Sequence, residues 1–167
     1  MKLYYAPGAC SLADHIALLE AGFSFETEAV DLHSKQTESG RDFRAINPKG
    51  YVPALVLDGG EIVTENIAVL DWIADQNPVL RPGGALGRTR LLEMLTFIST
   101  EIHRAYKPLW HASTEADKRN AAQAVESLLE FAAAPRHRSP LAIPPPRRPG
   151  RACPAPSWPA CGPACCG

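Results

Sequence analysis

A cysteine at the start of a predicted helix is the feature of this sequence best suited to chemistry. Cys10 follows a short apolar strand over residues 3–5 and a Pro-Gly turn over residues 6–9, and Ser11 opens the helix. Free backbone N–H groups and the positive end of the helix dipole lie at such a junction, and both stabilise a thiolate. We therefore predict a pKa for Cys10 below the ordinary value of roughly 8.5. The alternatives are a small buried apolar residue for Cys10 and a plain N-cap for Ser11.

The helix that follows Cys10 has recognisable ends and one apolar stripe. Ser11 with Asp14 three residues later is a variant of the capping box, and Gly22 suits the position just past the helix end. Residues at i, i+4 and i+7 lie on one helical face, which here predicts burial of Leu12, Ile16 and Leu19.

The elements that follow predict the fold class. Residues 25–32 read as a strand parallel to the first, because a helix connects the two. Residues 39–46 suit a short helix, and 52–57 and 61–64 suit an antiparallel hairpin. A helix then runs from Glu65-Asn66 to Pro78, with Ile67, Leu70, Ile73 and Ala74 on one face. This order is that of an α/β thioredoxin-like domain over residues 1–80.

A second, all-α segment is predicted over residues 86–133. The first of its two helices, 86–106, carries an apolar stripe of Leu91, Leu95, Ile98 and Ile102 beside a polar seam of Thr96, Ser99 and His103. The second helix, 115–133, places Ala121, Val125, Leu128 and Ala132 inward.

Composition excludes several classes of protein. The formal net charge of the 167 residues is −1, but the first 134 residues carry 12 Lys and Arg against 18 Asp and Glu. This body has no basic surplus for nucleic acid. We find no membrane span or signal-peptide pattern. Cys10 is the only one of the five cysteines within residues 1–134, so the cysteines do not form the disulfide framework of a secreted domain. We expect a soluble cytoplasmic protein without nucleic-acid or membrane partners.

The composition changes abruptly at residue 134. Ten of the 16 prolines and five arginines follow, and no Asp or Glu does. Proline at this density prevents regular structure, so we predict a disordered tail over 134–167. Its Pro, Arg, Ala and Gly bias is typical of a GC-rich gene read out of frame, which suggests a frameshift. One alternative is a polyproline linker. Another is a zinc-binding tract, but the cysteines lack the paired C-x-x-C spacing that zinc sites use.

Residues 1–133 resemble the bacterial glutathione S-transferases of the beta class. The resemblance lies in KLYYAPGACSLADHIAL, DLHSKQTESGRDFRAINPKGYVPALVLDGG, EIVTENIAVLDWIAD and FISTEIHRAYKPLW, in that order and spacing. The family has a thioredoxin-like glutathione-binding domain followed by an all-helical domain. The resemblance implies conjugation of the glutathione thiol to small electrophiles, thiol–disulfide exchange through Cys10 and a homodimer. Glutathione would be a co-substrate, and no cofactor or metal is expected.

The resemblance also implies three catalytic residues and a basic residue, Arg104, that helps to bind glutathione. Cys10 would face the glutathione sulfur, with Ser11 beside it at the helix N-terminus. His103, from the second domain, would approach the sulfur from the other side, and Arg104 would be a basic residue at the rim. Without the resemblance, His103 reads as a histidine packed between helices and Arg104 as a solvated charge.

Five further residues would bind glutathione. Lys35 would hold the glycine carboxylate. The Val52 backbone would pair with that of the cysteinyl residue, which requires a cis bond to Pro53. Glu65 would take the α-amino group, and Asn66 with its backbone N–H would take the α-carboxylate. The alternatives are a solvated charge for Lys35 and a simple helix start for Glu65 and Asn66.

The chain also departs from the family pattern. Thr96 stands where members often have Asn, and after Pro135 nothing resembles the family's further helices. A second hypothesis is therefore a non-catalytic truncated product that retains only the glutathione-binding fold.

Overall fold

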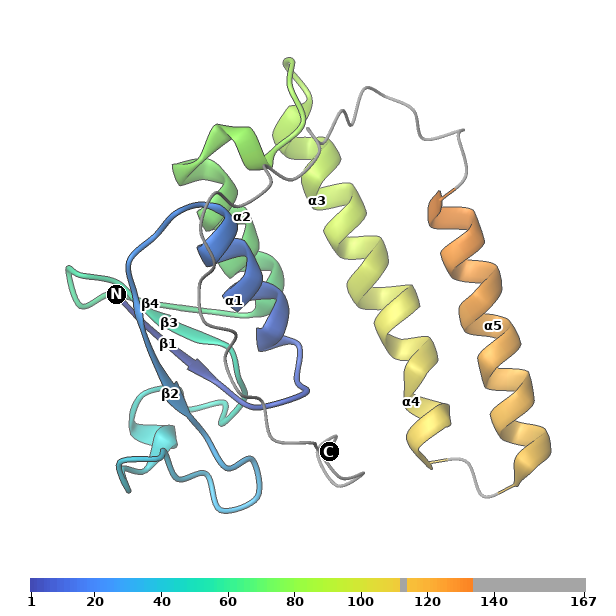
Figure 1. The fold of residues 1–167 in the computed structure, drawn as a ribbon, viewed down its shortest axis with the longest axis horizontal. Helices are drawn as coiled ribbons and strands as arrows, with labels where there is room; N and C mark the ends of the chain where they lie inside the picture. The colour runs from blue at the N-terminus through green and yellow to red at the C-terminus, as the bar shows by residue number, and fades with distance from the viewer. Residues whose placement is uncertain (112–113, 134–167) are drawn as a thin grey trace, which may run out of the picture. The chain divides into compact units, whose positions relative to one another are not determined.

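The computed structural model describes residues 1–111 and 114–133 (Figure 1). They form two compact units, Met1–Leu80 and a helical unit that begins at Arg81. The disorder predicted for 134–167 falls outside the described residues. No helix within the described part of the chain is long and apolar enough to cross a membrane.

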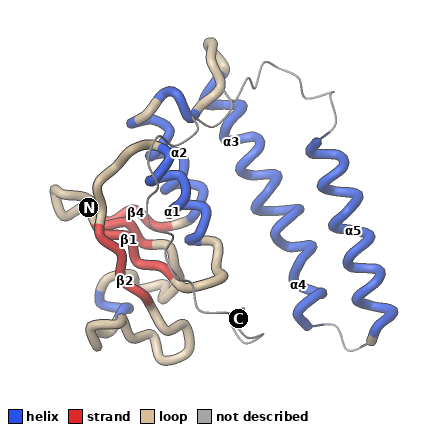
Figure 2. Tube along the Cα trace, in the orientation of Figure 1, coloured by secondary structure: helices blue, strands red, loops and turns tan. Residues whose placement is uncertain are grey.

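The first unit is the predicted thioredoxin-like α/β fold. Its elements are β1 (Lys2–Tyr5), α1 (Ser11–Glu20), β2 (Glu26–Ala29), the short 3-10 helices η1 (Phe43–Ala45) and η2 (Pro78–Leu80), β3 (Ala54–Val56), β4 (Ile62–Thr64) and α2 (Asn66–Gln76). The sheet, red in Figure 2, has the strand order β2-β1-β3-β4. β1 pairs with β2 in parallel and with β3 antiparallel, and β3 pairs with β4 antiparallel. This confirms the predicted fold class.

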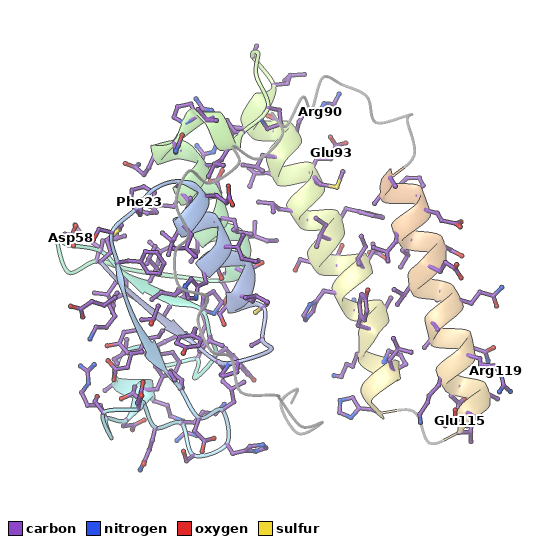
Figure 3. The ribbon with its side chains drawn as sticks, viewed as in Figure 1. Phe23, Asp58, Arg90, Glu93, Glu115 and Arg119 are labelled. Carbon is purple, nitrogen blue, oxygen red and sulfur yellow. The ribbon has the colours of Figure 1, made fainter. Side chains whose placement is uncertain are left out.

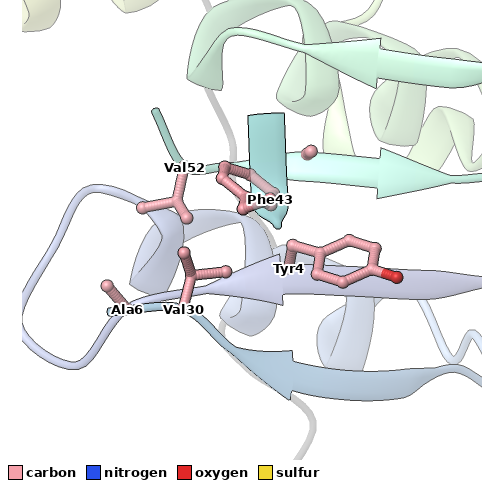
Figure 4. Close-up of a cluster of buried hydrophobic side chains, with 6 residues drawn as sticks. Tyr4, Ala6, Val30, Phe43 and Val52 are labelled. Atoms are coloured by element: carbon pink, nitrogen blue, oxygen red, sulfur yellow. The ribbon is translucent and has the colours of Figure 1, made fainter. Parts of the chain in front are cut away.

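Alternation along the strands divides the core between the two faces of the sheet. Leu3 and Leu55 are opposite each other in β1 and β3 and pack with residues of α1 and α2, namely Leu18, Val69 and Ile73. Their sequence neighbours Tyr4 and Ala54 point the other way, into the cluster of Figure 4 with Ala6, Val30, Phe43 and Val52. The loop between β2 and β3 therefore covers one face and the two long helices the other.

The predicted buried face of α1 is wrong. Leu12, Ile16 and Leu19 are 42%, 51% and 59% exposed, whereas the buried residues of the helix are Ser11, Asp14 and Leu18. The polar pair can be buried because each member has a hydrogen-bond partner inside the fold. The predicted cap is also wrong, since Ser11 is the first helical residue and Cys10 is the N-cap. Gly22 does have the left-handed backbone, φ +75°, expected past the helix end.

Glu28 ties the long loop between β2 and β3 to the sheet. This β2 residue is only 6% exposed and accepts hydrogen bonds from Lys2, Ser39 and Arg41 at 3.2, 2.6 and 2.9 Å. Burial favours the neutral acid, but the hydrogen bonds and the Arg41 charge prevail and lower the pKa of Glu28 to about 2. The loop that carries Lys35 is therefore anchored by an ion pair in which the Glu28 carboxylate is buried and the Arg41 guanidinium is exposed.

An aromatic pair packs the segment that follows α1 against α2. Phe23, labelled in Figure 3, stacks on Trp72 of α2 with ring centroids 5.7 Å apart. Val69, Ile73 and Ala74 are the buried residues of α2. The predicted face of α2 is thus right for Ile73 and Ala74, and it omits Val69.

The second unit contains both predicted helices. The first is α3 (Gly87–Phe97), which continues through a π-helical stretch, η3 (Ile98–Ile102), into α4 (His103–His111), and the second is α5 (Glu115–Ala133). Arg90 and Glu93, one turn apart on α3, form an ion pair of 2.6 Å (Figure 3). The Thr114 hydroxyl accepts the Asp117 N–H at 3.1 Å and caps α5.

Burial in the second unit matches the predicted stripes in part. Ala121 and Val125 of α5 are buried, and Ile102 is 7% exposed. Leu91 and Leu95 are half-buried, whereas Ile98 is 42% exposed. The π-helical stretch adds residues per turn, so a stripe drawn at ordinary helical spacing shifts around the axis there.

Candidate functional site

Three segments of the first unit meet at Cys10. The half-buried thiol lies at the N-terminal end of α1 and donates to the Val52 carbonyl, with a distance of 3.5 Å between sulfur and oxygen. The carbonyl of Cys10 accepts from the Asn66 side chain at 3.1 Å. Residues far apart in sequence, at the starts of α1, β3 and α2, are thus brought together around this cysteine.

Ser11 faces inward. Its side chain is fully buried, and its hydroxyl oxygen accepts from the Ala6 N–H at 3.2 Å and donates to the Ala6 carbonyl at 3.4 Å. These two bonds close the turn between β1 and α1. Ser11 therefore fixes the backbone that carries Cys10, and a contact with the glutathione sulfur remains a prediction.

The predicted lowering of the Cys10 pKa is wrong. Burial and, next, the Asp14 carboxylate raise the pKa of the thiol above its ordinary value. The backbone N–H groups of Cys10 and Ser11 do act in the predicted direction, but they are outweighed. In this structure Cys10 is therefore a thiol near neutral pH.

Asn66 links the first turns of α1 and α2. In addition to its bond to the Cys10 carbonyl, its side-chain amide donates to Asp14 Oδ2 at 2.9 Å. Both amide hydrogens are thereby used within the protein. The backbone N–H of Asn66, as the first residue of a helix, has no intrahelical acceptor. A ligand carboxylate would therefore be bound by the backbone rather than by the side-chain amide.

Glu65 directly precedes α2 in a strained conformation. Its φ of +74° lies in the left-handed region, which a non-glycine residue seldom adopts without a constraint. The Lys49 ammonium contacts Glu65 Oε1 at 2.5 Å and Thr64 Oγ1 at 3.3 Å. Lys49 is not among the predicted site residues, because residues 47–50 read as a turn. The Glu65 carboxylate is thus positioned toward solvent and paired with an exposed cation.

Lys35 is held against the segment that leads to β3. Its ammonium donates to the Gly50 carbonyl at 3.0 Å and lies 5.3 Å from the centroid of the Tyr51 ring. Its φ of +59° is also left-handed. The Lys35 ammonium therefore contacts Gly50, a residue two positions before Val52, which is another predicted binding residue.

Val52 and Pro53 are both buried at the entrance to β3, and the bond between them is cis, as the predicted pose requires. His103 and Arg104 begin α4 in the second unit, and both are exposed. The structure thus brings Cys10, Val52, Glu65 and Asn66 into one region of the first unit. The approach of the two α4 residues to that region remains a proposal.

The chemistry of this region suits a small, charged, thiol-bearing peptide. Glu65 offers an anion, the start of α2 offers backbone donors, Lys35 and Lys49 offer cations, and Cys10 offers a thiol. Within the described residues, no group of three or more His, Cys, Asp or Glu side chains is arranged to hold a metal ion.

Comparison with known proteins identifies relatives. Residues 9–76 match the model of the glutathione S-transferase N-terminal domain. Glutathione S-transferase GstA of Escherichia coli O157:H7 is 42% identical over 135 residues, which cover 78% of this chain and 67% of that protein. Glutathione S-transferase GST-4.5 of Xanthomonas campestris is 41% identical over 113 residues, 66% and 53% of the two chains.

Solved structures agree with this result. A sphingomonad glutathione S-transferase complexed with glutathione is 50% identical, with a TM-score of 0.70 over 79% of this chain and 68% of that one. The beta-class enzyme of Sphingomonas chungbukensis is 47% identical, with a TM-score of 0.69 over the same shares. These relatives favour a glutathione transferase over a non-catalytic product. The chain therefore belongs to the bacterial glutathione S-transferase family.

Proposed function

We propose that this chain binds glutathione at the N-terminal ends of α1 and α2 and transfers it to small electrophiles. The observation that carries this proposal is the junction at Cys10, whose thiol contacts the Val52 carbonyl and whose own carbonyl is bonded to Asn66. This junction presents a thiol, an extended backbone edge and a helix N-terminus to a single small peptide. A related sphingomonad protein has been solved with glutathione.

The proposed pose follows the charges of glutathione. The γ-glutamyl ammonium lies at Glu65, its carboxylate at the N–H groups that begin α2, and the cysteinyl backbone along Val52. Lys35 faces the glycine carboxylate. Residues 1–80 then form the glutathione-binding domain, and residues 86–133 belong to a helical domain.

The glutathione thiol must lose its proton to attack an electrophile. The N–H groups at the start of α1 favour an anion on the ligand sulfur, with Cys10 and Ser11 beside it. His103 and Arg104 of α4 complete the site in this proposal. We further propose a cytoplasmic homodimer that needs no cofactor and uses glutathione as a co-substrate.

Glu65→Gln is expected to weaken glutathione binding more than Lys35→Ala does. Loss of Glu65 leaves the ligand ammonium without its anion, which costs about 1.5–3 kcal/mol, or about tenfold or more in Kd. The Lys35 ammonium is already bonded to the Gly50 carbonyl, so its ion pair with the ligand carboxylate is expected to contribute only about 0.2–1 kcal/mol, up to about fivefold. Isothermal titration of each purified full-length variant with glutathione measures both effects.

The matched control for this comparison is Glu61→Gln, which removes an exposed carboxylate from the β3–β4 hairpin and should leave the affinity unchanged. Equal losses for Glu65→Gln and Lys35→Ala, or a larger loss for Lys35→Ala, would contradict the pose. Absence of glutathione binding by the unmodified chain would contradict the proposed function itself.

A further inference from the structure

A buried acid lies beneath the predicted catalytic cysteine. Asp14 is fully buried in the first turns of α1, one helical turn after Cys10. Its Oδ2 accepts from the Asn66 amide at 2.9 Å, and its Oδ1 has no hydrogen-bond partner among the described residues. An ionised carboxylate in such a place is costly, because half of its acceptor capacity is unused away from water.

The Asn66 amide connects this acid to Cys10. One of its hydrogens is bonded to Asp14 and the other to the Cys10 carbonyl, so the orientation of the amide depends on both partners. The Asp14 carboxylate also acts directly on the thiol through space and disfavours its negative charge. Asp14 thus affects Cys10 by a hydrogen-bonded path and by an electrostatic one.

The other charged groups around this pair are few within the described first unit. Glu65, just before α2, also disfavours the Cys10 thiolate, but it is exposed and paired with Lys49. His15, next to Asp14 in sequence, packs edge-on against Tyr5 and Phe25. Among the described charged groups, Asp14 is therefore the buried one with the strongest electrostatic effect on the Cys10 thiol.

We propose that Asp14 is a positioning residue for Cys10: its carboxyl group holds the Asn66 amide against the Cys10 carbonyl, and its charge state sets how readily the thiol ionises. With Asp14 neutral, the thiol loses its proton to solvent more easily. After Asp14 has released its own proton, the same ionisation places two negative charges near each other and becomes less favourable. Cys10 and Asp14 therefore titrate as a coupled pair. This inference does not depend on glutathione binding.

The coupling predicts a distinctive pH profile for alkylation of Cys10. Burial raises the pKa of Asp14 to about 7, so the logarithm of the alkylation rate should rise with pH, flatten near pH 7 and rise again. Iodoacetamide is applied to the full-length protein, and mass spectrometry follows the tryptic peptide of residues 3–35, which contains Cys10 and no other cysteine.

Asp14→Asn is the decisive variant. It keeps an oxygen for the Asn66 amide but removes the charge, so the flat region should disappear. Cys10 should then react several-fold faster at pH 8, since each unit by which a thiol pKa falls raises the rate about tenfold below that pKa. Glu61→Gln, which removes an exposed carboxylate from the β3–β4 hairpin, is the control and should keep the flat region.

Either of two results would overturn the proposal. One is a profile of the unmodified protein without an inflection near pH 7, a measurement that needs no variant to fold. The other is an Asp14→Asn protein, folded by circular dichroism, whose profile matches that of the unmodified chain. A purely structural role of Asp14 would change stability but leave the shape of the profile intact.

Discussion

Asn66→Ala is expected to destabilise the first unit by about 3 kcal/mol at pH 8.5 and by much less at pH 5. The substitution removes the hydrogen-bond donor of a fully buried carboxyl group, and the cost is greatest when that group is charged. The pKa of Asp14, raised to about 7 by burial, exceeds that of the unfolded chain. The neutral Asp14 carboxyl group therefore stabilises the fold at low pH, and this stabilisation is lost as the pH rises through about 7. The Asn66 hydrogen bond lowers the pKa of Asp14, so in the Asn66→Ala variant the loss of stability continues to higher pH.

Urea unfolding followed by circular dichroism at the two pH values measures this difference. Asn77→Ala is a matched control, because the Asn77 amide donates to a neutral group, the Ala21 carbonyl, at 3.1 Å. We expect it to cost about 1 kcal/mol at both pH values. An Asn66→Ala loss that is the same at pH 5 and pH 8.5 would show that Asp14 does not change its charge in this range.

Phe43→Ala is expected to destabilise the same unit by about 3–5 kcal/mol, the usual cost of deleting a buried aromatic ring. Phe43 is fully buried and packs against Tyr4, with ring centroids 5.7 Å apart. Its N–H donates to the Lys35 carbonyl at 2.8 Å. Removal of the ring therefore also loosens the loop that carries Lys35 and Lys49, and glutathione affinity should fall with stability.

Phe43→Leu keeps most of the buried volume and should cost about 1 kcal/mol with little change in affinity. Urea unfolding and isothermal titration with glutathione measure the two quantities on the same proteins. An alanine variant as stable as the leucine variant would mean that the loop does not depend on this ring.

The thioredoxin-like order of elements could be predicted because it depends on local patterns. Alternating and apolar runs gave β1 to β4, and the helix between β1 and β2 required a parallel pair. The turn at 58–60 gave the antiparallel hairpin. Each of these features is determined within a few residues of the chain.

The orientation of α1 could not be predicted in the same way. Hydrophobic spacing favoured Leu12, Ile16 and Leu19, whereas the sheet is covered by the face that holds Ser11 and Asp14. Burial of those two residues depends on acceptors and donors at Ala6 and Asn66, which no local pattern reveals. The raised pKa of Cys10 has the same origin, since it results from tertiary burial and from Asp14.

The candidate site shows the same division. The position of Cys10 at a strand–helix junction follows from the sequence, but nothing in residue spacing links Cys10 to Val52 and Asn66. Lys49 could not be predicted as a site residue, because a lysine in a turn is usually solvated. Only the fold brings it to Glu65.

The central claim is that this chain transfers glutathione to electrophiles, and the initial rate of conjugation tests it most directly. The purified full-length protein is mixed with an activated aryl chloride and increasing glutathione near pH 7, and product absorbance is followed against a blank without protein. We predict a rate above the blank that scales with protein concentration and saturates with glutathione. A rate that equals the blank and rises linearly with glutathione at every protein concentration would contradict the account.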